Sequence, residues 1–244
     1  MTVTNTASGT NVYEIAPGTY RISTPVPPGA VPGGFTFNQF LIDDEAPLLF
    51  HTGPRRLFPL VREAVEHVLG DASRLRYVAF SHVEADECGS LNEWLALAPN
   101  AEPVCSSIGA MVSVSDLSDR APRALSDGQE LSLGKHRLRW LDAPHVPHNW
   151  ECGYLFDATT RTLLCGDLFT HAGSDLAPLT EHDVLGPSEA TRRAIGGVAL
   201  EAGTRGILEK LAATEPQTLA LMHGSSYQGD GRALLLALAD ALGV

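Results

Sequence analysis

Four side chains that could bind a metal ion fall within one short acidic segment of the sequence. They are His82, Glu84, Asp86 and Glu87. Imidazole nitrogens combined with carboxylate oxygens suit iron or manganese, whereas zinc favours ligand sets richer in nitrogen and sulfur. The segment taken alone also fits an ordinary acidic loop, because Asp and Glu are common in loops, so the rest of the chain has to decide between the two.

The elements on either side of this segment should hold it in place. The residues directly before it, 76–80, are expected to form a short buried strand. A helix is expected after it, with Ser90 as the N-cap and Glu93 closing a capping box. The four side chains would then lie on a loop at the carboxyl end of a strand. A strand delivers such a loop to one point in space, and binding loops are often built that way.

Three more apolar strands are each expected to end on a candidate ligand. The first is followed by His145 and His148, the second ends on Asp167, and the third ends on His223. A lone His or Asp at a strand end is usually structural. A ligand cluster followed by single candidates after three separate strands is hard to obtain by chance, so the sequence predicts a metal site.

The segment His82–Leu91 reads HVEADECGSL. It resembles the metallo-β-lactamase superfamily and, within it, the diiron domain of the flavodiiron proteins, whose loop reads H-x-E-x-D-H followed by S-G-S-L. Hydrolases of the superfamily more often read H-x-H-x-D-H, so Glu84 favours the diiron branch. The likeness continues at residues 38–42, 95–101 and 104–106.

The resemblance implies a ligand set for two metal ions. The first ion would take His82, Glu84 and His148. The second ion would take Asp86 and His223. These five residues come from three of the loops described above.

The two remaining ligands connect or complete the pair of ions. Asp167 would bridge them, and Glu87 stands where the family has a second His ligand of the second ion. The family places 18 residues between its third-loop His and the bridging Asp, which is the separation of His148 and Asp167 and not that of His145. The resemblance therefore favours His148 over His145.

The resemblance also implies a function. Two iron ions are the expected cofactor, with manganese and zinc as alternatives, and the site would bind or reduce O₂ or NO. Turnover would need an external electron donor, such as a flavoprotein or a protein of the rubredoxin type. The family carries a flavodoxin-like domain after its metal domain, and no flavin-binding stretch is apparent after His223, so no flavin is expected in this chain.

Two other functions stay open at this stage. Two metal ions could activate a bridging water for attack on an ester, lactone or thioester, as superfamily hydrolases do. A non-enzymatic O₂ binder or sensor would need no electron donor. Glu84 favours the oxygen chemistry over hydrolysis, but the fold does not decide among the three.

Composition excludes several classes of partner. The formal net charge of −12 argues against nucleic acid and anionic membrane surfaces. No signal peptide and no apolar run of membrane-spanning length is seen. The 4 cysteines form neither a CxxC pair nor a disulfide framework, which fits a reducing cytoplasm. The oligomeric state, including a homodimer, stays open.

The pattern of elements predicts an α/β fold, a four-layer αββα metallo-β-lactamase sandwich in which residues 1–244 form one domain. Strands are expected over 12–22 and 35–51, with turns at 17–18 and 43–44. Hairpins are expected over 129–141 and 151–164. The expected helices are 58–69, 107–114, 188–213 with breaks at its glycines, and 232–242.

Several other side chains near the candidate ligands need a role. His51 either orients a ligand imidazole or is structural, and His171 is expected to be a bystander. Cys88 is adjacent to the acidic cluster, and its side chain is expected to point away from it. His67 and His136 are expected to be solvated residues of a helix and a hairpin.

Overall fold

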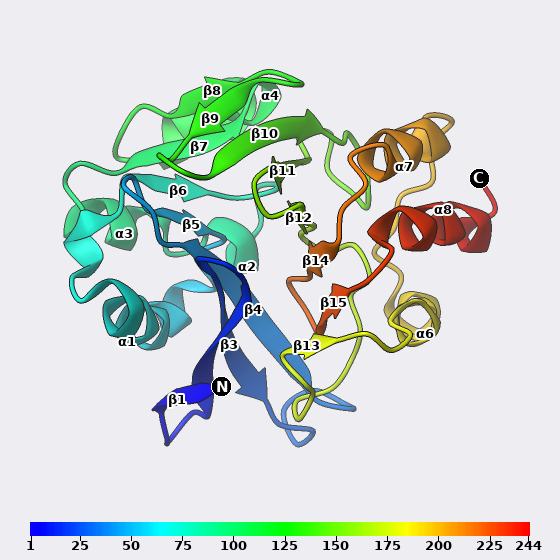
Figure 1. The fold of residues 1–244 in the computed structure, drawn as a ribbon, viewed down its shortest axis with the longest axis horizontal. Coiled ribbons are helices and arrows are strands. Elements are labelled where there is room, and N and C mark those ends of the chain that lie inside the picture. Colours follow the sequence, from blue (N-terminus) through cyan, green and yellow to red (C-terminus); the bar gives the residue numbers. More distant parts are fainter.

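Two β-sheets face each other across the centre of the protein, and helices cover the outer face of each (Figure 1). The computed structural model describes residues 1–244. Each sheet is apolar on its inner face, so burying both faces together requires two packed layers, and the outer faces require helices. The predicted four-layer αββα sandwich is confirmed.

The first sheet has 8 strands in chain order. They are β1 (Thr2–Asn5), β2 (Thr10–Ala16), β3 (Thr19–Val26), β4 (Phe35–Ile42), β5 (Leu48–Phe50), β6 (Tyr77–Ala79), β7 (Glu102–Ser106) and β8 (Arg123–Leu125). Neighbours from β1 to β5 are antiparallel, and those from β5 to β8 are parallel. The parallel half carries the acidic segment, which follows β6.

The second sheet has 7 strands in the order β13-β15-β14-β12-β11-β10-β9. They are β9 (Glu130–Ser132), β10 (Arg137–Asp142), β11 (Gly153–Asp157), β12 (Thr162–Leu164), β13 (Leu179–Thr180), β14 (Thr218–Ala220) and β15 (Ser226–Gln228). Strands β12 and β14 are parallel neighbours, so their carboxyl ends meet at one edge of the sheet. Both predicted hairpins, β9–β10 and β11–β12, are present.

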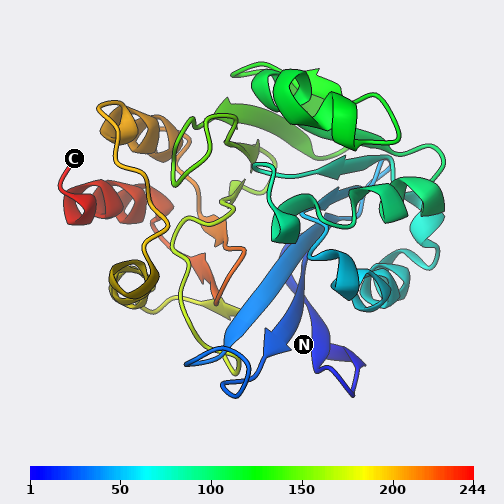
Figure 2. The same cartoon turned by 180° about the vertical axis from the view of Figure 1, so that it is seen from behind.

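The helices divide between the two outer faces, as the two opposite views show (Figures 1 and 2). The first sheet carries α1 (Phe58–Leu69), α2 (Ala85–Cys88), α3 (Leu91–Leu97), α4 (Ser107–Gly109), a π-helical turn (Ala110–Val114), α5 (Ser115–Leu117) and the 3₁₀ turns Arg55–Leu57 and Ala72–Arg74. The second sheet carries α6 (Leu185–Ile195), α7 (Thr204–Ala212) and α8 (Gly231–Leu242). None of these helices combines the length and the apolar character needed to cross a membrane.

The central core lies between the two sheets and fixes their relative position. Phe40 and Phe50 from the first sheet and Trp140, Leu155 and Leu164 from the second belong to one buried cluster. Two further clusters are present, one between the first sheet and its helices and one between the second sheet and its helices. Because interiors pack at crystal-like density, this core holds the loops at the sheet edges in a fixed relation to one another.

Two local predictions need correction. Residues 85–88 form the short helix α2, where a loop is predicted from the acidic residues. The capping box at α3 is wrong: the Ser90 hydroxyl donates to the carbonyl of Thr52, and Glu93 pairs with Arg55 instead. Both side chains find partners from a distant segment, and these replace the local hydrogen bonds that a capping box needs.

Candidate metal centre

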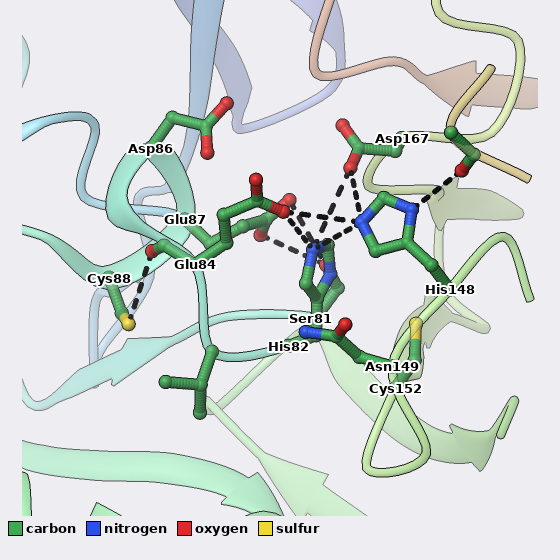
Figure 3. A network of polar contacts seen from close by, with 12 residues as sticks. Ser81, His82, Glu84, Asp86, Glu87, Cys88, His148, Asn149, Cys152 and Asp167 are labelled. Atoms are coloured by element: carbon green, nitrogen blue, oxygen red, sulfur yellow. Dashed lines mark hydrogen bonds and ion pairs between the residues drawn. The ribbon is translucent and has the colours of Figure 1, made fainter. Parts of the chain in front are cut away.

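Four side chains from three loops bring one nitrogen or oxygen atom each to a common point (Figure 3). His82 and Glu84 follow β6, His148 follows β10, and Asp167 follows β12. Their ligand-type atoms all lie within 4.8 Å of one another. The sequence prediction placed these four residues in one site, and the structure brings them together.

The distances among these atoms fit a shared metal ion. Nε2 of His82 lies 3.0 Å from Nε2 of His148 and 3.0 Å from Oε2 of Glu84. Nε2 of His148 lies 3.2 Å from that Glu84 oxygen and 3.4 Å from Oδ2 of Asp167. Four ligands placed tetrahedrally at about 2.0–2.2 Å from one ion are about 3.3–3.6 Å apart. The set therefore has the spacing that one ion requires.

Asp167 offers its two oxygens in two directions. Oδ2 faces His82 and His148, while Oδ1 lies 3.1 Å from Nε2 of His223. The same His223 nitrogen lies 3.4 Å from Oδ2 of Asp86. A second and smaller set, formed by Asp86, His223 and Asp167, thus adjoins the first, and the Asp167 carboxylate is shared between them.

Backbone carbonyls orient two of the imidazoles. Nδ1 of His148 lies 2.7 Å from the carbonyl oxygen of Gly197, and Nδ1 of His223 lies 2.7 Å from that of Thr36. A carbonyl only accepts hydrogen bonds, so each Nδ1 carries the proton and donates it. The Nε2 lone pair of each ring is then free to bind a cation, which is the usual arrangement of histidine metal ligands.

The third imidazole is oriented by side chains. Nδ1 of His82 lies 2.9 Å from the hydroxyl of Ser81, and that hydroxyl donates to Oε2 of Glu87 over 2.9 Å. Nε2 of His51 contacts the same Glu87 oxygen, and both side chains are fully buried. Since the Ser81 proton goes to Glu87, the hydroxyl accepts from His82, and Nε2 of His82 faces the other ligands.

The electrostatics show that the site attracts positive charge. Burial opposes a charge on His82, but Glu87, Cys152 and Glu84 together raise its pKa to about 12. Burial likewise opposes a charge on His223, and its hydrogen bonds to Asp167 and Asp86 raise its pKa to about 10. Protons on the imidazoles supply this charge when no metal is bound, and a metal ion would replace them.

The carboxyl groups respond in the opposite sense. Burial alone would raise the pKa of Asp167, but its hydrogen bond to His223 and the nearby imidazoles hold that pKa well below its usual value. The hydrogen bond from His82 lowers the pKa of Glu84. Both groups are therefore anions at neutral pH, and they complete a donor set that fits divalent metal ions.

Glu87 is the predicted ligand that the structure does not bring to either set. Its carboxylate faces Ser81 and His51, on the Nδ1 side of the His82 ring, opposite the converging Nε2 atoms. Figure 3 shows Asp86 turned away from the Ser81 and Glu87 contact, and the Asp86 carboxylate faces His223 instead. These two neighbours in sequence thus have different surroundings.

The remaining candidates lie outside the ligand sets. His171 is satisfied internally: its Nδ1 faces the carbonyl of Phe169, and its Nε2 accepts the backbone N–H of Ser225. The thiol of Cys88 donates to the carbonyl of Glu84 and points away from the cluster, as expected (Figure 3). His51 contacts a carboxylate that orients His82, which agrees with the orienting role over the purely structural one.

Sequence reasoning missed several residues that support the site. The Ser81 hydroxyl and the carbonyls of Thr36 and Gly197 orient the three imidazoles. The carbonyls carry no side-chain signal, so no sequence pattern could have revealed them. Ser81 could have been noticed, because it directly precedes the first ligand.

An apolar cavity of about 400 Å³ opens onto the ligand sets. Asp86, His148, Asp167 and His223 form its polar end. Its other walls are mostly apolar and include Val31, Phe35, Phe37, Val146, Leu168, Phe169, Ile195, Val198, Leu238 and Leu242. The Phe35 ring stacks on His223 with ring centroids 4.3 Å apart. The lining also includes Glu189 and Arg192, which form an ion pair with each other. The rest of the route to the candidate ligands is mostly apolar, which suits uncharged molecules.

Comparison with known sequences identifies relatives among flavoproteins. "Putative diflavin flavoprotein A 1" from Nostoc sp. is 32% identical over 143 residues, which make up 56% of this chain and 24% of the relative. "Rubredoxin-oxygen oxidoreductase" from Megalodesulfovibrio gigas is 26% identical over 142 residues, or 57% of this chain and 34% of the relative. The matched region thus spans about a quarter to a third of these relatives' length.

Solved structures share the fold. A metal-soaked flavodiiron core from Synechocystis sp. superposes with a TM-score of 0.80 at 22% identity, covering 96% of this chain and 61% of that one. A fragment of "putative diflavin flavoprotein A 5" from Nostoc sp. gives a TM-score of 0.78 at 19% identity, covering 95% and 94%. At these identities the likeness shows the fold.

A family model described as "ODP family beta lactamase" matches residues 35–185, which include every candidate ligand after β6, β10 and β12. The match, the flavodiiron relatives and the shared fold agree with one another. The chain therefore belongs to the ODP family of beta-lactamase-like domains, the family of the diiron domain of flavodiiron proteins.

Proposed function

We propose that this chain holds two iron ions and uses them to bind or reduce O₂ or NO. The observation that carries the proposal is the convergence of His82, Glu84, His148 and Asp167, with the second oxygen of Asp167 turned to His223. A carboxylate with one oxygen facing each set is the arrangement needed to bridge two ions. Manganese and zinc remain alternatives that metal analysis would distinguish.

The residues of the site have separate tasks in this proposal. Two ferrous ions, when bound, supply electrons and open coordination positions to a diatomic molecule. Glu84, Asp86 and Asp167 provide negative charge, which favours the ferric over the ferrous state because hard oxygen donors match the higher charge. The carbonyls of Thr36 and Gly197 hold the imidazoles of His223 and His148 in the metal-binding tautomer.

The cavity supports a small uncharged substrate. Phe35, Phe37 and Phe169 line the approach to Asp167 and His223. Transfer of a charged molecule into such an apolar space is costly, while O₂ and NO carry no charge and enter freely. The cavity thus favours these gases over anionic substrates such as phosphate esters.

Repeated turnover would need electrons from outside the site. One relative is named a rubredoxin-oxygen oxidoreductase, and others are named diflavin flavoproteins. We therefore propose a flavoprotein or a rubredoxin-type protein as the donor. Binding of O₂ without a donor would instead mark the chain as an oxygen binder or sensor.

The test is to load the protein with Fe²⁺ without oxygen and then mix it with O₂ or NO. We expect a change in the near-ultraviolet and visible spectrum within the mixing time, or loss of ferrous iron measured by a chelator. Asp167→Ala protein treated in the same way is the control. A loaded wild-type protein that keeps all its iron ferrous and shows no spectral change with either gas contradicts the proposal.

A second candidate is a metal-dependent hydrolase of apolar esters, lactones or thioesters. The size of the cavity favours it, because about 400 Å³ falls in the range of organic-ligand pockets and far exceeds a diatomic molecule. A panel of lactones and aryl esters with increasing acyl length tests this candidate. Metal-dependent cleavage that improves with chain length, in protein inert toward O₂, would favour hydrolysis.

A further inference from the structure

Asp86 and Glu87 are neighbours in sequence but face different parts of the molecule. Both lie on the single helical turn α2, where consecutive side chains point about 100° apart. Asp86 lines the apolar cavity beside His223. Glu87 is fully buried on the other side, against Ser81 and His51. The backbone of α2 therefore directs one carboxylate to the metal site and the next one away from it.

The contacts of Glu87 form a chain that ends on a metal ligand. His82 donates from Nδ1 to Ser81, and Ser81 donates to Glu87, each over 2.9 Å. His51 contacts the same Glu87 oxygen and is as fully buried as Glu87 is. Space for this chain depends on Gly166, where a Cβ atom would come within 2.7 Å of the Ser81 hydroxyl oxygen. A buried carboxylate with these partners is fixed in place.

The two ligand sets differ in size as a result. The first set holds His82, Glu84, His148 and Asp167 with all four ligand atoms within 4.8 Å. The second set holds only Asp86, His223 and the other oxygen of Asp167. A residue at position 87 would add a ligand to this second set if its side chain faced the cavity. In this chain the Glu87 side chain contacts Ser81 instead, and Ser81 orients His82 of the first set.

We propose that Glu87 is a positioning residue for His82, and that the two metal positions consequently differ in affinity. The first position binds its ion tightly, because it has four protein ligands and an imidazole anchored through Ser81 and Glu87. The second position binds its ion weakly, because it has only three protein ligands. The inference rests on the proposed function only in that a divalent metal is taken as the ligand.

The experiment titrates the metal-free chain with Fe²⁺ in the absence of oxygen. Binding is monitored by calorimetry and by competition with a coloured chelator. Mn²⁺ is the second probe, and its binding is monitored by electron paramagnetic resonance. We expect two binding steps with dissociation constants that differ by at least about tenfold, or about 1.4 kcal/mol. Two steps of equal affinity would overturn the inequality of the positions.

Two variants assign the steps to the two sets. Asp86→Asn alters only the second set, so it should remove the weak step and retain the tight one. Glu84→Gln alters only the first set, so it should weaken the tight step. The opposite assignment, with Asp86→Asn removing the tight step, would also overturn the proposal.

Two further variants test the role of Glu87. Glu87→Gln keeps the shape of the side chain and removes its charge, and Ser81→Ala breaks the chain at its middle. Each should weaken the tight step about 10- to 100-fold, the usual effect of removing a group that orients a metal ligand. The weak step should keep its affinity. A Glu87→Gln protein that loses only the weak step would show that Glu87 is a direct ligand of the second ion.

Asp157→Asn is the matched control, because Asp157 is a buried carboxylate paired with a histidine away from the site. It should leave both metal steps unchanged, while thermal unfolding confirms that each variant is folded. Reactivity toward O₂ is measured separately on the loaded protein. An inert protein with two unequal steps would contradict the proposed function and still support this inference.

Discussion

Two groups of histidine and carboxylate side chains lie in this protein, and only one of them has the form of a metal site. In the β9–β10 hairpin, Nδ1 of His136 lies 2.8 Å from Oδ2 of Asp157. Asp157 also accepts hydrogen bonds from the Thr160 hydroxyl and the Thr159 backbone N–H. Each acceptor atom of Asp157 therefore has a donor within the protein.

The group around His82 is arranged differently. Nε2 of His82 and of His148 and single oxygens of Glu84 and Asp167 point at one another, and no Ser, Thr or backbone N–H lies between them. Imidazole nitrogens and carboxylate oxygens that converge on one point are stabilised by positive charge among them, supplied by protons or by a metal ion. The difference shows that residue types alone do not define a metal site; the convergence of several ligand-type atoms on one point does.

Removing the Asp167 carboxylate, which the two ligand sets share, is expected to have the largest effect on the metal site. Asp167→Ala is expected to abolish binding of both ions, because Asp167 faces both ligand sets. Metal analysis after reconstitution with excess Fe²⁺ measures the bound ions, with two per chain expected for the wild type. Asp157→Ala is the control and should keep its metal. An Asp167→Ala protein that retains two ions would show that Asp167 is not a bridge.

The His136–Asp157 pair should respond in the opposite way. Removing it should lower the stability of the protein and leave metal binding unchanged. Asp157→Asn leaves the buried His136 without its anionic partner, and a lost buried hydrogen bond of this kind costs about 1–3 kcal/mol. Urea unfolding of the metal-free protein measures the change in unfolding free energy. No measurable change would mean that the pair contributes nothing to stability. This outcome would weaken the contrast between the two groups.

The pH dependence of the pair sharpens the comparison. The Asp157 hydrogen bond raises the pKa of His136 above its usual 6.5, against the effects of burial and Lys135. Burial acts to raise the pKa of Asp157, but His136 and the two threonines lower it below its usual 3.8. The pair is fully stabilising between these usual values.

The stabilisation by the pair should decline on both sides of that range. As the pH rises through the raised pKa of His136, the imidazole loses its proton and its charge. As the pH falls through the lowered pKa of Asp157, the carboxylate gains a proton. The difference in unfolding free energy between the wild type and Asp157→Asn should therefore be largest near pH 5 and smaller at pH 9. A difference that is constant from pH 5 to pH 9 would contradict an ion pair.

The smallest effect is expected for the cysteine beside the metal site. Cys88→Ser should leave metal content and metal affinity unchanged, because the thiol donates to the carbonyl of Glu84 and does not face the ligands. A serine hydroxyl can donate to the same carbonyl. Loss of either metal-binding step in this variant would identify Cys88 as a ligand.

The sequence was a good guide to the elements and to most of the site. The helix over 58–69 has the predicted bounds, since its apolar spacing and the glycine after it define both the face and the end. His148 is favoured over His145 by the spacing that the resemblance implies, while the positions of His82, Asp167 and His223 follow from apolar runs that end close to a polar residue. Such signals lie within a few neighbouring residues and need no knowledge of distant contacts.

The failures have two causes, which are distant partners and an element too short to leave a sequence pattern. His136 is predicted to be solvated because it lies near a hairpin turn, yet it is buried because Asp157 on the next strand accepts from its ring. Ser90 and Glu93 find Thr52 and Arg55 in place of each other. The orientation of Glu87 depends on the four-residue helix α2, which is too short to leave a periodic pattern.

The candidate ligands also come from both layers of the sandwich: the segment after β6 belongs to the first sheet, and His148, Asp167 and His223 follow strands of the second. Neither half alone carries a complete set of candidate ligands, so we expect tight metal binding only after the two sheets have docked. Metal uptake during refolding would therefore report the docking of the sheets. Free metal at 100 times its dissociation constant would then hold the halves together with about 2.7 kcal/mol.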